Sequence, residues 1–560
     1  MPSEVEIIKE NSNYLRGTIK ESLVNEITGA LAPDDINLIK LHGSYQQFDR
    51  DLESERKKQK LEPLYSFMTR IRLTGGIATS PQWLTVDELS SKYANGTIKL
   101  TTRQAFQLHC ILKRSLKQTI REVNDALMNT IAACGDVNRN VMCNPNPFLS
   151  AIHAEVQEYA QKLSDHLTPR TTAYYEIWLD KQLLHGGEQD EEPIYGKTYL
   201  PRKFKIAIAI PPYNDSDIFS NDVGLIAIEN NGLLEGFNVA VGGGLGMTFG
   251  NNKTYPRLAN VIGYIPKEKV VDVAEKIVLV QRNLGNRDDR KNARLKYTID
   301  RIGIEQFKEE VYKLLGYSLE EARPYHFVSS GDTYGWKRGS NGNWHLTLFV
   351  EGGRIRDTET VKLKSALRQI ATFHTGDFRL TGNQNLIIAN IEVAHKKKIE
   401  KIFAENNVLP ERNLTGLRLN SIACVALNTC SLAFAEAERY LPSLIDKLDD
   451  ILVENMIEKE PILIRMTGCP NGCGRPYLGE IGFVGKAPGR YNVYLGAGCT
   501  GERLNKLYKE NLNEQEILDA LKPVLEDFAK ARLINERFGD FVIRRGYVKE
   551  TTEGLNFHNE

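Results

Sequence analysis

Four cysteines in two spaced pairs are the residues of this chain best suited to bind a metal centre. Cys424 and Cys430 have five residues between them, Cys469 and Cys473 have three, and 38 residues separate the pairs. The five-residue spacing fits a structural zinc site poorly, and a thioredoxin-like pair would need two residues. Four thiolates also suit an iron–sulfur cluster, which tolerates wider spacing. The spacing therefore favours a [4Fe–4S] cluster, with four unrelated buried cysteines as the alternative.

The second pair lies in a stretch rich in glycine and proline, TGCPNGCGRPYLGE at residues 467–480. A cluster needs backbone N–H groups turned towards its sulfides, and Gly472 and Gly474 permit such turns. Pro470 fixes its own φ and removes one competing donor. These features predict a tight ligand loop around Cys469 and Cys473.

Basic residues alternate along two predicted strands. In PRKFKIAIAI, Lys203 and Lys205 share a face with Ala207 and Ala209, and larger apolar residues take the other face. Arg70 and Arg72 are spaced in the same way in MTRIRLTGG, and Arg139 lies among amides in GDVNRNVMC. The pattern fits a strand that lines an anion-binding cavity. It fits equally a solvent-exposed face on which lysine side chains reach the solvent.

Composition excludes several classes of function. Of the 560 residues, 41% are hydrophobic and 26% charged, and 72 Lys plus Arg balance 72 Asp plus Glu. No overall field therefore favours nucleic acid or an anionic membrane. The N-terminus has no apolar signal region, and no apolar run approaches the roughly 20 residues that a membrane helix needs. We expect a cytoplasmic protein of roughly two to four domains that binds neither nucleic acid nor membrane.

An internal repeat indicates two related half-units. IKLTTRQAFQLHCI at 98–111 aligns without a gap with FRLTGNQNLIIANI at 378–391. Two such units predict a pseudo-twofold axis with a cleft between them. Helical periodicity covers 267–285, where Gly285 is expected as a left-handed cap, and 431–456, with an interruption at Pro442. Strands and helices together indicate an α+β fold, and 53–63 reads as an exposed arm or linker.

Longer fragments resemble one family along nearly the whole chain. ACVALNTCSLAFAEAERYLPS and TGCPNGCGRPYLGEIGFVGKAPGRYNVYLG resemble the siroheme-binding nitrite and sulfite reductases. The resemblance implies an internally duplicated fold with ferredoxin-like half-domains and mixed α/β cofactor-binding domains. The implied division is an N-terminal arm at 1–66, half-domains at 67–131 and 335–411, a siroheme- and sulfite-binding domain at 132–334, and a cluster- and siroheme-binding domain at 412–560.

The resemblance also assigns site residues. It implies that Cys424, Cys430, Cys469 and Cys473 hold a [4Fe–4S] cluster, with Cys473 also axial to the siroheme iron. The family's sulfite-binding quartet falls on Arg70, Arg139, Lys203 and Lys205. Further siroheme contacts are expected from the following residues: Arg103, Gln107, His109, Asn471 and Arg294. Arginine stands at 294 where the family pattern has lysine, which keeps the charge but changes the donor geometry.

The implied activity is the six-electron reduction of sulfite to sulfide for cysteine biosynthesis. SNYLRGTI and TYLPRKFK favour the haemoprotein subunits of NADPH-linked enzymes. A ferredoxin-dependent siroheme nitrite or sulfite reductase is the alternative. Because no dinucleotide fingerprint or flavin domain is evident, NADPH, FAD and FMN are expected on a separate flavoprotein alpha subunit, with the arm at 1–66 as the docking candidate. An iron–sulfur electron carrier or sensor, and a zinc-stabilised binding module, are the competing classes.

Overall fold

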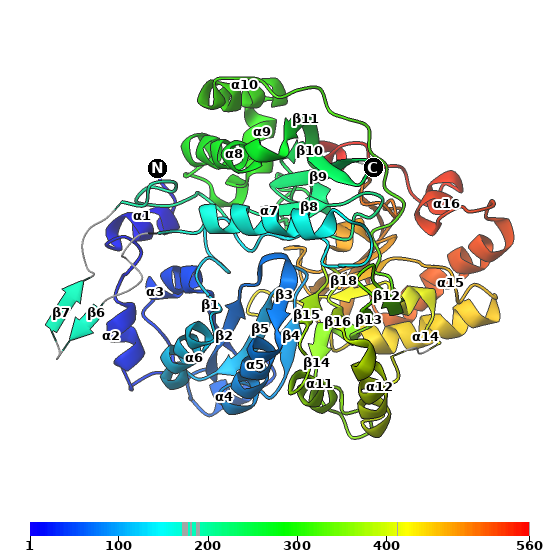
Figure 1. Cartoon of the computed structure of the whole chain (residues 1–560), viewed down its shortest axis with the longest axis horizontal. Coiled ribbons are helices and arrows are strands. Elements are labelled where there is room, and N and C mark those ends of the chain that lie inside the picture. The colour runs from blue at the N-terminus through cyan, green and yellow to red at the C-terminus, as the bar shows by residue number, and fades with distance from the viewer. Residues whose placement is uncertain (171–176, 180–181, 186–190, 411–412, 559–560) are drawn as a thin grey trace.

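The computed structural model describes residues 1–170, 177–179, 182–185, 191–410 and 413–558 (Figure 1). Among these residues, four larger sheets and one two-stranded hairpin are arranged around three main hydrophobic cores. The hairpin comprises β6 (Ile177–Leu179) and β7 (Gln182–His185). No helix in the described part of the chain is both long and apolar enough to cross a membrane.

The predicted repeat forms two half-domains of the same design. Each consists of a strand, a helix, a β-hairpin and a second helix. In both halves the aligned segments form the hairpin. The first half has β2 (Tyr65–Ile71), α5 (Ser80–Lys92), β4 (Ile98–Leu100), β5 (Phe106–Ile111) and α6 (Lys113–Asp125). The second has β13 (Trp344–Leu348), α11 (Leu363–Ala371), β15 (Asp377–Leu380), β16 (Leu386–Ile391) and α12 (Lys396–Glu405).

The two half-domains exchange short strands. β3 (Ile77–Thr79) follows β2 but pairs with β15, and β14 (Arg354–Ile355) follows β13 but pairs with β4. The contacts are reciprocal in detail, because Gln104 Nε2 donates to Leu380 O at 2.9 Å and Gln384 Nε2 donates to Leu100 O at 3.4 Å. The predicted pseudo-twofold relation is confirmed.

One hydrophobic core serves both half-domains. Trp83 of α5 stacks on Phe378 of β15, with ring centroids 4.6 Å apart, and meets Phe106 of β5 edge-on at 5.6 Å. The outer strands complete each sheet: β1 (Ser44–Phe48) pairs with β2, and β12 (Gly335–Arg338) pairs with β13. Neither half-domain therefore has an apolar core of its own.

Residues 138–170 and 191–320 build a third layer on one side of this pair (Figure 1). Its sheet has the order β11-β10-β9-β8, with β8 parallel to β9. Gly285 ends α8 in extended conformation (φ −66°, ψ 144°), so the expected left-handed cap is wrong. The elements are β8 (Ile206–Ala209), β9 (Val223–Asn230), β10 (Leu233–Val241), β11 (Asn260–Pro266), α7 (His153–His166), α8 (Val270–Leu284), α9 (Leu295–Ile302) and α10 (Ile304–Leu315).

The C-terminal layer has a mixed sheet of order β17-β18-β19-β20-β21. The helix expected over 431–456 is shorter, because Pro442 lies in the first turn of α14 and starts the helix instead of interrupting it. The elements are α13 (Gly416–Leu419), β17 (Ser421–Ala423), α14 (Leu441–Glu454), β18 (Ile464–Thr467), β19 (Ile481–Ala487), β20 (Arg490–Leu495), β21 (Lys506–Leu512), α15 (Glu514–Ala531) and α16 (Phe538–Arg544).

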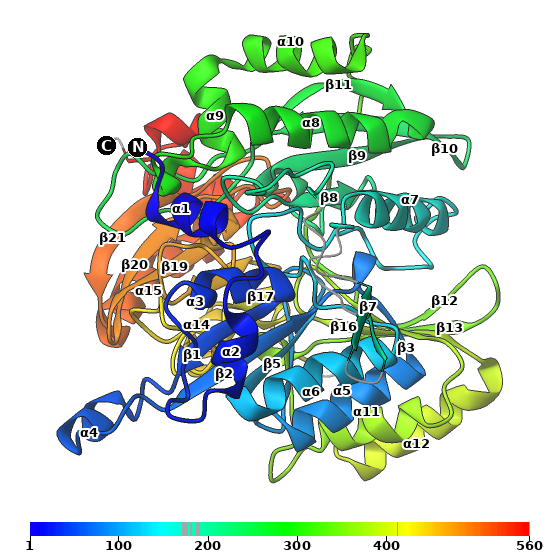
Figure 2. The same ribbon diagram turned by 90° about the vertical axis from the view of Figure 1, so that its left-hand side faces the viewer.

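The N-terminal segment is mostly integrated into the body. It contains α1 (Glu4–Asn11), α2 (Ile19–Val24), α3 (Asp35–Leu38) and α4 (Glu53–Lys58). Ile8 and Leu15 pack into the core of the third layer, and β1 extends a half-domain sheet. Only α4 has no buried residue, and Figure 2 shows it projecting from the body. The exposed part of the expected arm is thus the short segment around α4.

Candidate functional site

Two parallel strands bring three of the four cysteines to one sheet edge. Cys424 directly follows β17, and both Cys469 and Cys473 follow β18. Because β17 and β18 are parallel, with Ala423 opposite Met466, their carboxyl ends lie at the same edge. The backbone N–H of Gly468 reaches Cys424 Sγ at 3.4 Å, so the two ligand loops touch.

The fourth cysteine closes the group. The Cys430 N–H donates to Ala426 O at 3.0 Å, which closes a turn in its loop. Burial raises the pKa of Cys424 well above its usual range, and charge repulsion from Cys473, Cys469 and Cys430 adds to it. In the described residues, no three His, Cys, Asp or Glu side chains converge as ligands of one ion. A four-iron cluster needs a wider cage than a single ion, and four adjacent thiols supply its donor set.

Glycine is required where these loops cross. A Cβ on Gly468 would lie 2.4 Å from Ala435 O, and one on Gly474 would lie 2.5 Å from Met466 O. Gly472 adopts the left-handed conformation, with φ +68°. The expectation that Gly472 and Gly474 permit tight turns is therefore confirmed in two ways, by a positive φ and by close backbone approach.

A partly open cavity adjoins Cys473. Its lining includes the following predicted site residues: Arg103, Lys203, Lys205, Arg294, Asn471 and Cys473. These residues come from the first half-domain, the third layer and the loop that carries Cys469 and Cys473. The cavity is therefore formed where these three parts meet. Asn471 Nδ2 also lies 3.3 Å from Cys469 Sγ.

The two lysines reach the cavity because of the predicted alternation. Phe204 and Ile206 pack in the core of the third layer, whereas Ala207 and its neighbour Ala209 pack in a second, smaller cluster. Residues around Asn138 run parallel to this strand, and Arg139 N donates to Phe204 O at 3.0 Å. The backbone pairing thereby places Arg139 beside the lysines.

Burial and neighbouring positive charges lower the pKa of both lysines. Burial and the charge of Arg202, followed by Arg139 and Arg294, lower the pKa of Lys203 to about 7. Burial and the charge of Lys203 lower the pKa of Lys205 well below its usual range. A bound anion would reverse much of this effect, since opposite charge favours the protonated form.

The two predicted arginines of the cavity differ in availability. Arg294 makes a bidentate ion pair with Asp222, at 3.0 and 2.7 Å, so its charge is largely neutralised. Arg103 donates to Asn221 Oδ1 and Ile206 O, both at 2.7 Å. Its buried Nε has no hydrogen-bond partner in the described structure, as expected of a cation prepared for an anionic ligand.

The remaining predicted residues, Arg70, Arg139, Gln107 and His109, do not line this cavity. Arg70 donates to Gln107 Oε1 at 3.0 Å and to Cys134 Sγ at 3.0 Å, and Arg139 reaches the Tyr45 hydroxyl at 3.5 Å. Burial raises the pKa of Tyr45, whereas Arg139 and Arg70 lower it. The two arginines thus share one tyrosine next to the lysines.

A hydrogen-bonded chain runs from Arg70 towards the cluster loop. Gln107 Nε2 lies 2.8 Å from His109 Nε2, and His109 Nδ1 lies 3.4 Å from Thr429 Oγ1, next to Cys430. Burial, with Arg354, lowers the pKa of His109 well below its usual range, which keeps the ring neutral. Since Gln107 donates to Nε2, the ring proton is on Nδ1 and points to Thr429.

Two cations near the cavity were missed from the sequence. Arg475 lines it next to Cys473, and its buried Nε has no hydrogen-bond partner among the described residues. Lys296 is fully buried behind Arg294 and donates to the carbonyls of Gly244 and Gly246, both at 3.0 Å. Arg475 lies two residues after Cys473, so its position in the sequence could have identified it as a site residue. Lys296 lies in the basic run NRDDRKNARLK, where nothing distinguishes it from surface charge.

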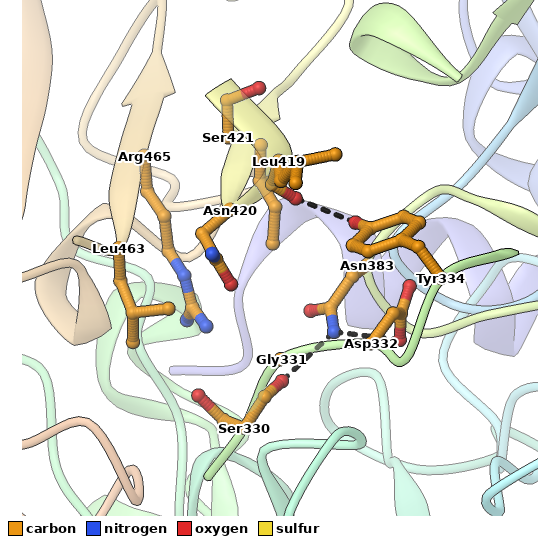
Figure 3. A pocket seen from close by; sticks show the side chains of 11 residues that line it. Ser330, Gly331, Asp332, Tyr334, Asn383, Leu419, Asn420, Ser421, Leu463 and Arg465 are labelled. Atoms are coloured by element: carbon orange, nitrogen blue, oxygen red, sulfur yellow. Dashed lines mark hydrogen bonds between the residues drawn. The ribbon is translucent and has the colours of Figure 1, made fainter. Parts of the chain in front are cut away.

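The duplication does not produce a second copy of the cavity. Asn383 takes the repeat position of Arg103 and lines a small cavity whose polar groups bind one another (Figure 3). Asn383 Nδ2 donates to Ser330 O at 2.9 Å and Asp332 Oδ1 at 3.1 Å, and the Tyr334 hydroxyl donates to Leu419 O. Only the half carrying Arg103 faces Cys473.

Comparison with known proteins identifies the class. The model described as "Nitrite/Sulfite reductase ferredoxin-like half domain" matches residues 59–126 and 337–406. The model described as "Nitrite and sulphite reductase 4Fe-4S domain" matches residues 158–319, which contain none of the four cysteines. The chain belongs to the nitrite and sulfite reductase family.

Several full-length relatives share the name "Sulfite reductase [NADPH] hemoprotein beta-component". That of Geobacillus thermodenitrificans is 60% identical over 561 residues, covering 100% of this chain and 98% of the relative. Those of Staphylococcus saprophyticus and Bacillus licheniformis are 58% and 59% identical, covering 99% and 100% of this chain and 98% of each relative. The structure of Mycobacterium tuberculosis NirA, 24% identical, has the same fold, with a TM-score of 0.77 and 97% of each chain covered.

Family membership implies two cofactors, a [4Fe–4S] cluster and siroheme. The donor chemistry of the site fits both. Four adjacent thiols suit the cluster, and an open cavity with several cations beside Cys473 suits a macrocycle that carries many carboxylates. The duplicated α+β fold expected from the sequence is confirmed.

Proposed function

We propose that this chain is the haemoprotein subunit of a sulfite reductase and supplies sulfide for cysteine biosynthesis. The observation that carries the proposal is the cavity in which Cys473 faces Lys203, Lys205 and Arg103. A redox ligand and a concentration of buried positive charge meet there in a protein with no net charge. The curated relatives named as sulfite reductase beta-components support the same function.

The proposed cofactor ligands follow from this geometry. Cys424, Cys430, Cys469 and Cys473 would hold the cluster, and Cys473 would also bind the siroheme iron. Siroheme and cluster, when bound, supply the redox chemistry. Arg103 and Asn471 line the cavity and would bind siroheme from its wall, together with Arg294, whose pairing with Asp222 makes it the weaker donor. Gln107 and His109 would act from behind Arg70, because both nitrogens of His109 already have partners.

The substrate is an oxyanion, and its reduction consumes protons. Hydrogensulfite takes up six electrons and six protons to give hydrosulfide and three water molecules. Lys203, with a pKa near 7, can hold a proton or release it at the oxygen that leaves. The planar guanidinium groups of Arg70 and Arg139 would clamp the remaining oxygens. We propose that these three residues and Lys205 form the sulfite-binding quartet.

The visible spectrum tests the proposal directly. The purified protein is expected to show a Soret band and a red, chlorin-like band, and both should shift when sulfite is added. A broad shoulder alone, unchanged by sulfite, in a host that makes siroheme would refute the reductase assignment. Rates with sulfite and nitrite under one artificial donor then determine the substrate, and we expect the higher kcat/KM for sulfite.

Electrons are proposed to come from a flavoprotein alpha subunit that carries FAD and FMN and oxidises NADPH. The named relatives are components of an NADPH enzyme, which implies such a partner. The projecting α4 is our candidate docking element, since the rest of the N-terminal segment is packed. Replacing residues 54–60 with a Gly-Ser linker of equal length, which keeps Glu53, should slow flavoprotein-driven turnover and leave dye-driven turnover unchanged. If both turnover rates fall equally, α4 has a structural role and not a docking role.

A further inference from the structure

The segment between β1 and α4 contacts the loop that carries Cys430. Arg50 N donates to Asn428 O at 3.0 Å. The Arg50 guanidinium then lies against three consecutive parts of that loop, with Nη1 at 3.5 Å from Cys430 O, 3.4 Å from Ser431 O and 3.4 Å from Ala433 O. The backbone and the side chain of Arg50 together therefore bind carbonyl groups before Cys430, at it and after it, from a segment about 380 residues away in sequence.

Arg50 is held in this position from its own side. Its guanidinium lies 5.8 Å from the Phe48 ring centroid, and its Nε is 3.2 Å from Glu53 Oε2. The next residue, Asp51, forms an ion pair with Arg439 at 2.8 Å. The ligand loop is thus fastened at Asn428 and again at Arg439.

The contact is more specific than ordinary packing of a loop. The Arg50 side chain is 28% exposed, so it is neither a free surface group nor a core residue. The Arg50 guanidinium also brings a positive charge directly beside the Cys430 backbone. A cation beside a ligand favours the form of a cluster with more negative charge, which is the reduced form.

We propose that Arg50 is a positioning residue for the cluster, holding the Cys430 loop closed and raising the cluster's reduction potential. The inference rests on the proposed function, because it takes Cys430 to be a cluster ligand. It assigns the N-terminal segment a role in cluster chemistry that is separate from docking a partner. Since α4 begins three residues after Arg50, a protein bound to α4 would also act on this clamp.

Three variants test the proposal in the full chain. Arg50→Gln removes the charge and most of the donors, and Arg50→Lys keeps the charge but cannot span three carbonyls. Arg56→Gln is the matched control, since Arg56 belongs to α4 and donates to Glu62 O at 2.8 Å, away from the cysteines. Iron and acid-labile sulfide per chain, the rate of cluster loss to a chelator, and the cluster midpoint potential are measured for each.

Arg50→Gln is expected to lose its cluster roughly tenfold faster, the factor that one charge-assisted hydrogen bond provides, and to show a more negative midpoint potential. Arg50→Lys should restore most of the potential but only part of the retention, and Arg56→Gln should match the wild type. Wild-type loss rate and potential in Arg50→Gln would overturn the proposal. If Arg50→Gln does not accumulate, Arg50→Lys decides, because unchanged retention there would refute the clamp. Wild-type protein without iron and sulfide would instead refute the proposed function.

Discussion

At the scale of single residues, the site contains several cations whose mutual repulsion destabilises the folded protein until an anion binds. Lys203 and Lys205 are half-buried next to Arg139, Arg103 and Arg294, and in the described structure neither lysine forms an ion pair with a carboxylate. A desolvated charge without an oppositely charged partner lowers the stability of the folded state. The same arrangement gives an oxyanion several donors that need little reorganisation. Binding strength at this site is therefore coupled to stability.

Lys203→Met should stabilise the protein before cofactors and sulfite bind. The folded pKa of Lys203, about 7, lies below its unfolded value of 10.5. The folded state therefore loses stability as pH falls from 10.5 to 7, and the full loss persists below 7. The variant should gain about 1–4 kcal/mol in free energy of unfolding at pH 7, and nothing near pH 10.5.

Lys296→Met is the control for that prediction. Lys296 is also buried with a lowered pKa, but it donates to three backbone carbonyls, which the substitution would leave without a donor. It should therefore destabilise by about 1–3 kcal/mol. Denaturant unfolding at pH 7 and pH 10 measures both variants. A destabilised Lys203→Met would contradict the coupling of binding to stability, and spectral titration should show weaker sulfite binding in it.

Substituting His109 of the Gln107–His109 pair is expected to change the affinity of the protein for sulfite. His109→Leu breaks the link between Arg70 and Thr429, so the Arg70 side chain is no longer fixed by Gln107. Sulfite affinity should fall by about tenfold, corresponding to about 1.4 kcal/mol. His345→Leu, a buried neutral histidine on β13 of the other half-domain, should leave affinity unchanged while costing similar stability. If both variants bind sulfite equally well, the hydrogen-bonded link from Arg70 to Thr429 has no role in substrate binding.

At the scale of elements, the crossing of the ligand loops after β17 and β18 decides whether the cysteines meet. Gly468→Ala places a methyl group against Ala435 O and 2.7 Å from the Ala426 Cβ, so the loop that ends in Cys430 must move. Gly498→Ala, whose nearest contact would be 3.4 Å, is the control. Gly468→Ala should lose most cluster iron, while the control keeps it. Full iron content in Gly468→Ala would show that the loop adapts.

At the scale of the whole molecule, exchanged strands and one shared core make the two half-domains a single cooperative unit. Phe378→Ala removes the ring that stacks on Trp83 and should cost about 3–5 kcal/mol. Hydrogen exchange should then rise together in β4–β5 and β15–β16, because neither hairpin has a separate core. Phe541→Ala, in the C-terminal core, should leave both hairpins protected. Faster exchange confined to the second half would contradict a common unit.

The sequence by itself determined the repeat, the α+β class, the cysteine quartet and the alternation of Lys203 and Lys205, because each depends on local spacing and side-chain periodicity. It did not determine where α14 begins or how Gly285 ends α8, since tertiary contacts choose among similar local conformations. Only the tertiary structure separated residues that line the cavity, such as Arg103, from those behind it, such as His109. It alone placed Arg50 on the Cys430 loop, because no local pattern records a contact between segments so distant in the chain.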